Sequence, residues 1–131
     1  MVVDTSALIA IILAEPEAAS FTLAIEADEI RLISAVILLE ASVVMEWRTG
    51  AAGADELERL VQHLGLSVEA FDAEQARAAQ TAYRRYGKGR HPARLNLTDC
   101  CSYALAVTSG EPLLFKGNDF SQTDVPRVTL P

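Results

Sequence analysis

Short, mainly apolar segments alternate with longer helical segments along the whole chain, and this alternation restricts the fold more than any other feature. Strands are expected at residues 2–3, 30–34, 66–71 and 112–115. Strands that alternate with helices indicate a parallel sheet covered on both faces and joined by right-handed crossovers. The sequence therefore predicts a three-layer α/β/α sandwich around a short, mostly parallel sheet of four to five strands, the fifth being a short edge strand at residues 127–130.

Helices are expected in the intervals between these strands. The first two begin after Asp4 and after Pro16, and the glycines within residues 50–53 predict a break in the chain. The remaining helices are expected at residues 35–47, at residues 54–64, from a cap at Asp72 to about residue 86, and from Asn96 through residue 107.

The composition is that of one acidic globular unit. With 131 residues, half of them hydrophobic, we expect a single domain over residues 1–131. Eighteen acidic and eleven basic side chains give a net charge of −7, which repels nucleic acid unless a basic surface is local. Cys100 and Cys101 are adjacent, which predicts neither a disulfide nor a zinc site and fits a cytoplasmic location.

The apolar start of the chain, residues 2–14, could be taken for a signal peptide. It carries Asp4 and lacks a basic leader, so we expect it to belong to the core. No other segment approaches the roughly 20 apolar residues of a membrane span, and no membrane association is predicted.

Four acidic side chains fall where the predicted fold could bring them together. Asp4 and Asp119 follow the first and fourth strands, and ligands of such sheets bind beyond the carboxyl ends of the strands. Asp99 lies at the start of a helix. Glu40 lies among residues that should face the interior, where a charge needs a partner; they are Val36, Ile37, Val43 and Val44.

Each acid also has a purely structural interpretation. Asp4 could cap the following helix, and Asp99 fits an ordinary capping arrangement with Asn96. Asp119 fits a plain turn, and Glu40 could form a buried ion pair or lie at the edge of a rotated helix. These alternatives stay open for each residue alone, and only the joint placement favours one site.

Four neighbouring carboxylates would repel one another, and a divalent cation would reverse that penalty. Mg²⁺ and Mn²⁺ prefer carboxylate oxygens and water, so neither His63 nor His91 is required as a ligand. Such a metal supports phosphodiester hydrolysis without a protein nucleophile. The hydroxyls of Thr5, Ser6 and Ser34 could hydrogen-bond the carboxylates, or could simply cap helices.

Basic residues gather in one acid-free stretch. We call Arg84, Arg85, Lys88, Arg90 and Arg94 the basic segment. These side chains could bind an RNA backbone, with Tyr83, Tyr86 and His91 available to stack on unpaired bases. The alternative is a solvated helix end whose arginines favour the helix dipole.

Four segments in this order resemble the PIN-domain ribonucleases, in particular the VapC toxins of type II toxin–antitoxin systems. They are VVDTSAL, LLEASVV, LNLTDCCSYALA and LLFKGNDF, and the resemblance covers essentially the whole chain. It implies a PIN-like fold, a requirement for Mg²⁺ or Mn²⁺, and endonucleolytic cleavage of RNA. It also implies Asp4, Glu40, Asp99 and Asp119 as the four acidic positions, a homodimer, and a cognate VapB-like antitoxin that blocks the site.

Two further hypotheses remain at this point. Asn118 stands where relatives often carry a second carboxylate beside the fourth acid, and together with the negative net charge this allows a catalytically idle PIN-like module that binds RNA or a partner. Asp4 at the end of the first strand also allows another magnesium-dependent phosphohydrolase or a phosphoacceptor domain. Leu38, Leu39 and Trp47 could form an interface, with core packing as the default expectation.

Overall fold

The protein is described here by a computed structural model that covers residues 1–130. Strands β1 (Val2–Val3), β2 (Leu32–Ser34), β3 (Ser67–Glu69) and β4 (Leu113–Leu114) form one sheet. Its order is β3-β2-β1-β4, and every pairing is parallel. The predicted α/β class with a parallel sheet is confirmed.

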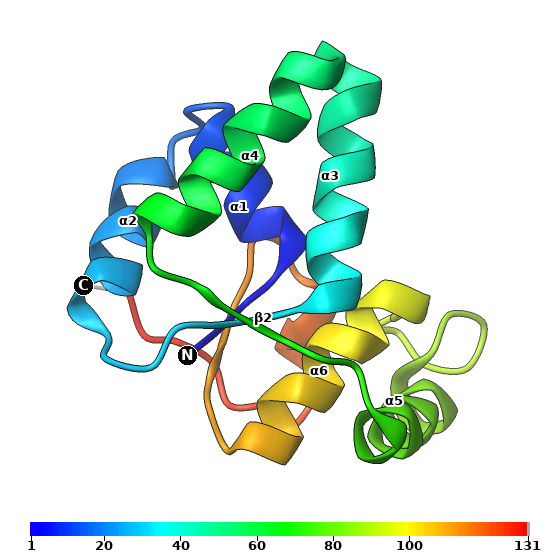
Figure 1. The fold of residues 1–131 in the computed structure, drawn as a ribbon. Coiled ribbons are helices and arrows are strands. Elements are labelled where there is room, and N and C mark those ends of the chain that lie inside the picture. Colours follow the sequence, from blue (N-terminus) through cyan, green and yellow to red (C-terminus); the bar gives the residue numbers. More distant parts are fainter. Residues whose placement is uncertain (131) are drawn as a thin grey trace.

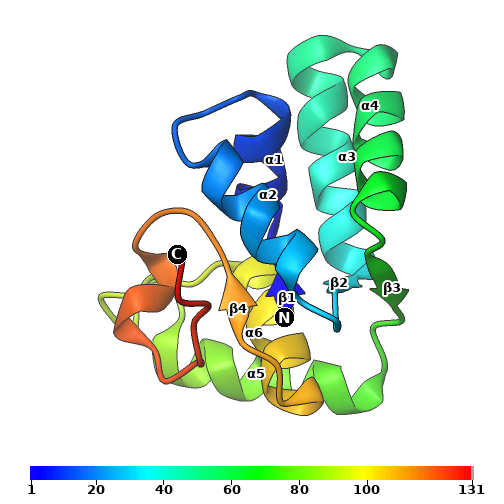
Figure 2. The same ribbon diagram turned by 90° about the vertical axis from the view of Figure 1, so that its left-hand side faces the viewer.

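Helices cover both faces of the sheet. Helices α1 (Thr5–Ile12), α2 (Ala18–Ala27), α3 (Ala35–Thr49) and α4 (Ala51–His63) lie on one side, as Figures 1 and 2 show. Helices α5 (Ala73–Tyr86) and α6 (Leu97–Ser109) lie on the other. The three predicted layers are therefore present.

Side chains of the strands alternate between the two faces, because successive residues of a strand point to opposite sides. Val3, Ile33 and Leu114 belong to the core beneath α1 to α4. Their neighbours Val2, Leu32 and Leu113 pack into a second core with α5 and α6. Strands of two residues are long enough to hold both helical layers, because one residue packs against the helices on one face and the next packs against those on the other.

The strand order reverses beside β1. The chain builds outward from β1 through β2 to β3, then returns and places β4 on the other side of β1. In parallel sheets the loops diverge at such a point and leave a crevice beyond the carboxyl ends of the strands. Asp4 directly follows β1, and a short 3₁₀ helix (Asp119–Gln122) follows β4.

Two sequence predictions are corrected. The expected edge strand at residues 127–130 is wrong, because that segment makes only one bridge, between Leu113 and Arg127. Two backbone hydrogen bonds join this segment to β4, from the Leu113 N–H to the Pro126 carbonyl at 2.8 Å and from the Val128 N–H to the Leu113 carbonyl at 3.0 Å, and within residues 1–130 the pairing does not extend past Val128. The expected break at residues 50–53 is present but shorter than predicted: α4 begins at Ala51 rather than at residue 54, and Gly50, at φ 73°, alone separates α3 from α4.

Gly53 lies inside α4 for a packing reason. A Cβ at this position would come within 1.8 Å of the Thr49 hydroxyl and 2.8 Å of the Met45 carbonyl oxygen of α3. Glycine thus permits the close approach of the two helices rather than breaking one. Within residues 1–130, no helix is both long and apolar enough to span a bilayer.

Candidate functional site

Asp4 is buried at the end of β1 and caps α1. Its Oδ2 accepts hydrogen bonds from the backbone N–H of Ser6 at 3.0 Å and from the Ser6 hydroxyl at 2.7 Å. Its Oδ1 accepts a hydrogen bond from the hydroxyl of Ser102 on α6. The capping interpretation is therefore correct, and it leaves the carboxylate fixed at the strand end with contacts to two helices.

Glu40 projects from α3 without an ionic partner. Among residues 1–130 it makes no salt bridge, so the buried ion pair is wrong. The Thr5 hydroxyl donates to its Oε2 at 2.6 Å, and the Thr98 hydroxyl donates to its Oε1 at 2.5 Å. Hydroxyls from α1 and α6 thus fix both oxygens of a half-buried carboxylate.

The orientation of α3 differs from the sequence prediction. The buried face consists of Ile37, Ala41 and Met45 at four-residue spacing, whereas Val43 is 49% exposed. Glu40 therefore lies at the border between the buried and exposed faces. The position of Glu40 therefore agrees with the alternative in which α3 is rotated and Glu40 lies at its edge, and not with a side chain that faces the interior.

Asp99 lies in the first turn of α6 and completes a capping box with Asn96. Its backbone N–H donates to the Asn96 side chain, and its own Oδ2 accepts from the Asn96 backbone N–H, both at 2.8 Å. Burial raises the pKa of Asp99 to about 6, against the lowering effect of the Asn96 hydrogen bond. The charges of Asp4, Asp119 and Glu40 raise this pKa further, so the four carboxylates interact electrostatically.

Asp119 is exposed at the start of the 3₁₀ helix. Phe120 anchors this turn, since it is 2% exposed and its ring lies 5.0 Å from that of Phe115. Asp119 thus does belong to a turn, which is the structural interpretation that the sequence left open for it. The buried neighbour holds the turn against the molecule while the carboxylate stays free.

All four acids line one cavity of about 350 Å³, which we call the acid cavity. Three further charged side chains line it as well, Glu15, Arg48 and Lys116. Sequence reasoning missed these three because each reaches the cavity only through the tertiary arrangement of the elements around it. The sequence suggested that four acids lie together, and the structure places all of them on the wall of one cavity: Asp4, Glu40, Asp99 and Asp119.

The acid cavity suits a hard cation by its donor chemistry, although its side chains do not form a ready ligand cage. Within residues 1–130, no three His, Cys, Asp or Glu side chains are grouped closely enough to hold a metal ion as they stand. Burial raises the pKa of Asp99 most, and the charges of Asp4, Asp119 and Glu40 raise it further, so the cavity holds like charges close to one another. Oxygen donors and excess negative charge are what Mg²⁺ or Mn²⁺ requires.

The nearby thiols take no part in this chemistry. Cys100 and Cys101 are both buried and free of disulfides. Burial, followed by the charge of Asp99, raises the pKa of Cys100 to about 12. A protonated, buried thiol is neither a nucleophile nor a metal ligand at neutral pH.

Comparisons with known proteins agree with this arrangement. A family model described as PIN domain matches residues 1–126. Ribonuclease VapC30 of Mycobacterium tuberculosis is 52% identical over 131 residues, which is 100% of both chains. The chain belongs to the VapC ribonucleases of the PIN-domain family.

Other relatives and one solved structure fit this membership. Ribonuclease VapC of Mycolicibacterium smegmatis is 51% identical over 128 residues, covering 98% of this chain and 99% of the relative. A crystal structure of VapC20 from M. tuberculosis, described as a toxin that cleaves the sarcin-ricin loop, aligns with a TM-score of 0.77. It covers 97% of both chains at 18% identity and so supports the PIN fold alone.

The hydroxyls around the acids of this VapC chain differ from those predicted. Thr5 and Ser6 do donate to Glu40 and Asp4, but Ser34 caps α3 by accepting from the Val36 N–H at 3.3 Å. Ser34 has no hydrogen bond to a carboxylate among the described residues. Sequence reasoning missed Thr98 and Ser102. The signal for Ser102 was its position three residues after Asp99, which places both on one side of α6.

The basic segment lies outside the acid cavity. Lys88, Arg90 and Arg94 line a separate shallow hollow in the loop between α5 and α6. Arg84 is exposed at the end of α5, whereas Arg85 is paired to Asp124 at 3.0 Å. The structure thus brings the four acids together, but it does not bring the five bases to them.

The aromatic side chains near the basic segment, Tyr83 and Tyr86 at the end of α5 and His91 in the following loop, are mostly committed to packing. Tyr86 is only 8% exposed, and its ring packs edge-on against His91 at 5.1 Å, so the prediction that Tyr86 stacks on bases is wrong. The His91 Nδ1 accepts from the backbone N–H of Ala93 at 3.1 Å. Tyr83 remains 40% exposed beneath the Arg90 guanidinium.

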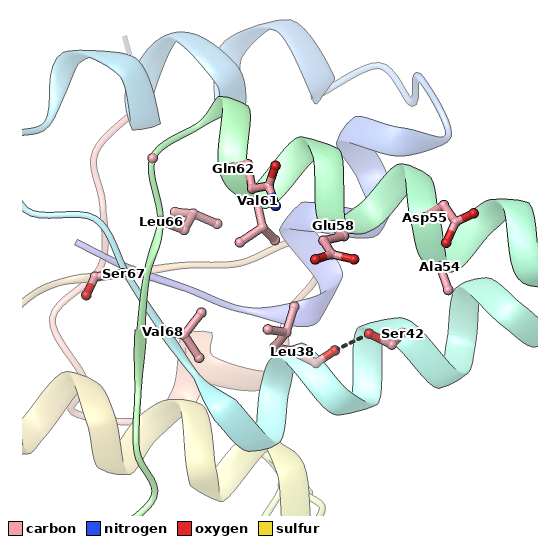
Figure 3. A pocket seen from close by; sticks show the side chains of 11 residues that line it. Leu38, Ser42, Ala54, Asp55, Glu58, Val61, Gln62, Leu66, Ser67 and Val68 are labelled. Atoms are coloured by element: carbon pink, nitrogen blue, oxygen red, sulfur yellow. Dashed lines mark hydrogen bonds between the residues drawn. The ribbon is translucent and has the colours of Figure 1, made fainter.

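A larger hollow of about 740 Å³ lies elsewhere, between α3, α4 and the edge strand β3 (Figure 3). Leu38, Val61, Leu66 and Val68 form its apolar part, and Asp55 and Glu58 lie on α4 above them. None of the four predicted acids lines it. The candidate site is therefore not the larger hollow but the acid cavity, which lies at the strand ends and gathers the four carboxylates.

Proposed function

We propose that this VapC chain is a Mg²⁺- or Mn²⁺-dependent endoribonuclease that acts in the cytoplasm as the toxin of a toxin–antitoxin pair. The observation that carries the proposal is the acid cavity, in which Asp4, Glu40, Asp99 and Asp119 from four distant points of the chain share one surface. The raised pKa of Asp99 supports a site that needs a cation. RNA as substrate rests on the relatives, which are named ribonucleases.

The proposed metal would be held by carboxylate oxygens of the same four acids. When bound, Mg²⁺ or Mn²⁺ supplies charge neutralisation, a lowered pKa for water and stabilisation of the leaving oxygen. The chain's own contribution is to hold the carboxylates still. Ser6 and Ser102 fix Asp4, and Thr5 and Thr98 fix Glu40.

The same hydrogen bonds argue that water, not a side chain, attacks the phosphorus. The hydroxyls of Thr5, Ser6, Thr98 and Ser102 all donate to carboxylates. The thiol of Cys100 stays protonated, and neither histidine lines the acid cavity. Among the described residues no activated nucleophile is therefore available in the cavity.

The partners follow from the family membership and from one exposed surface. We propose an RNA substrate, a VapB-like antitoxin and a homodimer. Leu39, Val43 and Trp47 are 65%, 49% and 88% exposed along one face of α3, so core packing of Leu39 and Trp47 is wrong. Such an apolar stripe on a charged protein favours burial against another chain.

A cleavage assay tests the enzymatic proposal. Single-stranded RNA is incubated with wild-type protein in Mg²⁺ or Mn²⁺, with and without a chelator, and with Asp4→Asn. We expect cleavage only in wild type with metal. Cleavage that survives both the chelator and Asp4→Asn would overturn the proposal.

The idle-module alternative keeps two observations in its favour, Asn118 beside Asp119 and the net charge of −7. It predicts RNA or partner binding without cleavage at any metal concentration. An intact RNA that still binds the protein in the same assay would favour that alternative.

A further inference from the structure

Two cations line the acid cavity, and they differ in how they are paired. The Lys116 Nζ lies 2.5 Å from Glu15 Oε2 and 3.1 Å from Glu17 Oε2. Arg48 makes no salt bridge with any of residues 1–130. One cation is therefore already matched by two carboxylates, and the other is available to an anionic ligand.

Lys116 is also tied into the support of Asp4. Its backbone N–H donates to the Ser6 hydroxyl oxygen at 2.9 Å, and that hydroxyl donates to Asp4. Hydrogen bonds from Glu15 and then Glu17 raise the pKa of Lys116. A phosphate would have to displace one of these partners, so Lys116 is best described as a structural cation.

Arg48 shares a face of α3 with Glu40. Glu40, Val44 and Arg48 are spaced by four residues, and all three line the acid cavity. Eight residues of helix span about 12 Å, so the guanidinium belongs to the cavity rim rather than to its acidic centre. Arginine at such a place suits phosphate, because its planar fork donates two hydrogen bonds to two oxygens.

The charge of the cavity makes this position important. Five acidic side chains line it, against Arg48 and Lys116, and the whole chain carries a net charge of −7. An RNA strand that approaches the acids is repelled unless a cation guides it. The basic segment does not line the acid cavity, so it cannot supply that contact there.

We propose that Arg48 binds an RNA phosphate that flanks the scissile bond, while Lys116 holds the loop of Glu15 and Glu17 in place. This inference rests on the proposed nuclease function. The contact with Arg48 directs the RNA strand across the C-terminal end of α3. The rival explanation is that Arg48 only complements the dipole at that helix end.

Binding and cleavage are measured separately to test the inference. Labelled single-stranded RNA is titrated in Mg²⁺ with Asp99→Asn protein, alone or combined with Arg48→Ala, Arg48→Lys or Arg59→Ala. Arg59 is a matched control, since it is exposed on α4, makes no salt bridge among the described residues and does not line the acid cavity. Steady-state cleavage is measured with the same changes in the otherwise wild-type chain.

We expect Arg48→Ala to weaken binding and raise KM about tenfold while kcat changes less than about twofold. The slope of log Kd against log salt should fall by about 0.7, the value for one phosphate contact on a single strand. Arg48→Lys should keep the slope, and Arg59→Ala should change neither quantity. A helix-dipole role would leave the slope unchanged.

Each outcome separates the two proposals. Arg48-dependent binding without any cleavage by wild type would support the Arg48 contact and overturn the nuclease function. Cleavage by wild type with equal Kd values for Arg48→Ala and Arg59→Ala would overturn the Arg48 contact alone. RNA that does not bind at all would overturn it too.

Discussion

The acid cavity holds its charges in place with hydrogen bonds, whereas the basic segment carries most of its charges on exposed side chains. Asp4 and Glu40 each accept hydroxyl donors at both oxygens. Arg84, Lys88, Arg90 and Arg94 are exposed and make no salt bridges within residues 1–130. This difference indicates a preorganised centre on one side and an adaptable, salt-screened surface on the other.

The two regions are also assembled differently. The acids come from β1, α3, α6 and the segment after β4, so only the strand order brings them together. The basic segment is local in sequence: Arg84 and Arg85 lie in the last turn of α5, and the other three bases lie in the loop that the bridge between Gly87 and Leu95 closes. Substitutions in the first region should therefore change chemistry, and those in the second should change RNA affinity.

The largest effect is expected at the centre of the acid cavity. Asp99→Asn keeps the size of the side chain but removes a charge that interacts with three other carboxylates. We expect RNA cleavage to fall more than about 100-fold, because loss of a mere supporting contact at metal sites already costs 10–100-fold. Glu58→Gln, which lines the other hollow, is the matched control and should retain activity.

A smaller loss is expected when only the support of an acid is removed. Ser102→Ala deletes the hydroxyl that donates to Asp4 Oδ1, and we expect about tenfold weaker Mn²⁺ binding and slower cleavage. Ser109→Ala on the same helix loses hydrogen bonds to the Leu105 and Ala106 carbonyls and one from the Glu111 N–H, none of them with an acid of the cavity, and serves as control. Equal Mn²⁺ affinities for the two variants would show that the acids need no hydroxyl support.

The basic segment should give a smaller and salt-dependent effect. The combined change Arg84→Ala, Lys88→Ala and Arg90→Ala should weaken RNA binding about fivefold at physiological salt with kcat nearly unchanged. Fluorescence anisotropy at several salt concentrations measures this. An unchanged affinity would favour the solvated helix end over an RNA contact.

The smallest effect concerns pH and the metal-free protein. The pKa of Asp99 is raised to about 6, above its ordinary value of about 4, so the folded state binds this proton more tightly than the unfolded chain does. The protonated Asp99 side chain therefore stabilises the folded state fully below about pH 4. This stabilisation is lost as the pH rises through about 6. In a chelator, the Tm should fall by a few degrees across this interval.

Asp99→Asn is the control for that measurement, because it cannot titrate. Its Tm should be flatter over the same pH range than that of wild type. A wild-type Tm with the same pH dependence as that of Asp99→Asn between pH 4 and pH 6 would contradict the raised pKa.

The sequence predicted that the four acids lie close together because short apolar segments and capping residues show where strands end and helices begin. It could not predict how α3 is rotated, since Val36, Ile37, Val43 and Val44 left two faces almost equally apolar. The true buried face follows from its contact with α4, where Gly53 admits close packing. Long-range packing of this kind has no local signature.

The missed residues were single polar groups whose helical spacing from a predicted acid, as for Ser102 and Arg48, does not by itself show which way the helix faces. Thr98 and Ser102 could equally have bonded to the carbonyls of their own helix, as Thr108 and Ser109 do. Lys116 lines the acid cavity because it follows β4, and Arg48 lines it from the same face of α3 as Glu40. Such assignments need the tertiary arrangement.

Calorimetric titration of Mn²⁺ into the metal-free protein at pH 7 tests the central claim most directly. If the four carboxylates form a metal centre, wild type and Glu58→Gln should bind Mn²⁺ with equal affinity, and Asp4→Asn and Asp99→Asn should each abolish or greatly weaken it. Binding that is absent from wild type, or that survives both aspartate changes undiminished, would contradict the account.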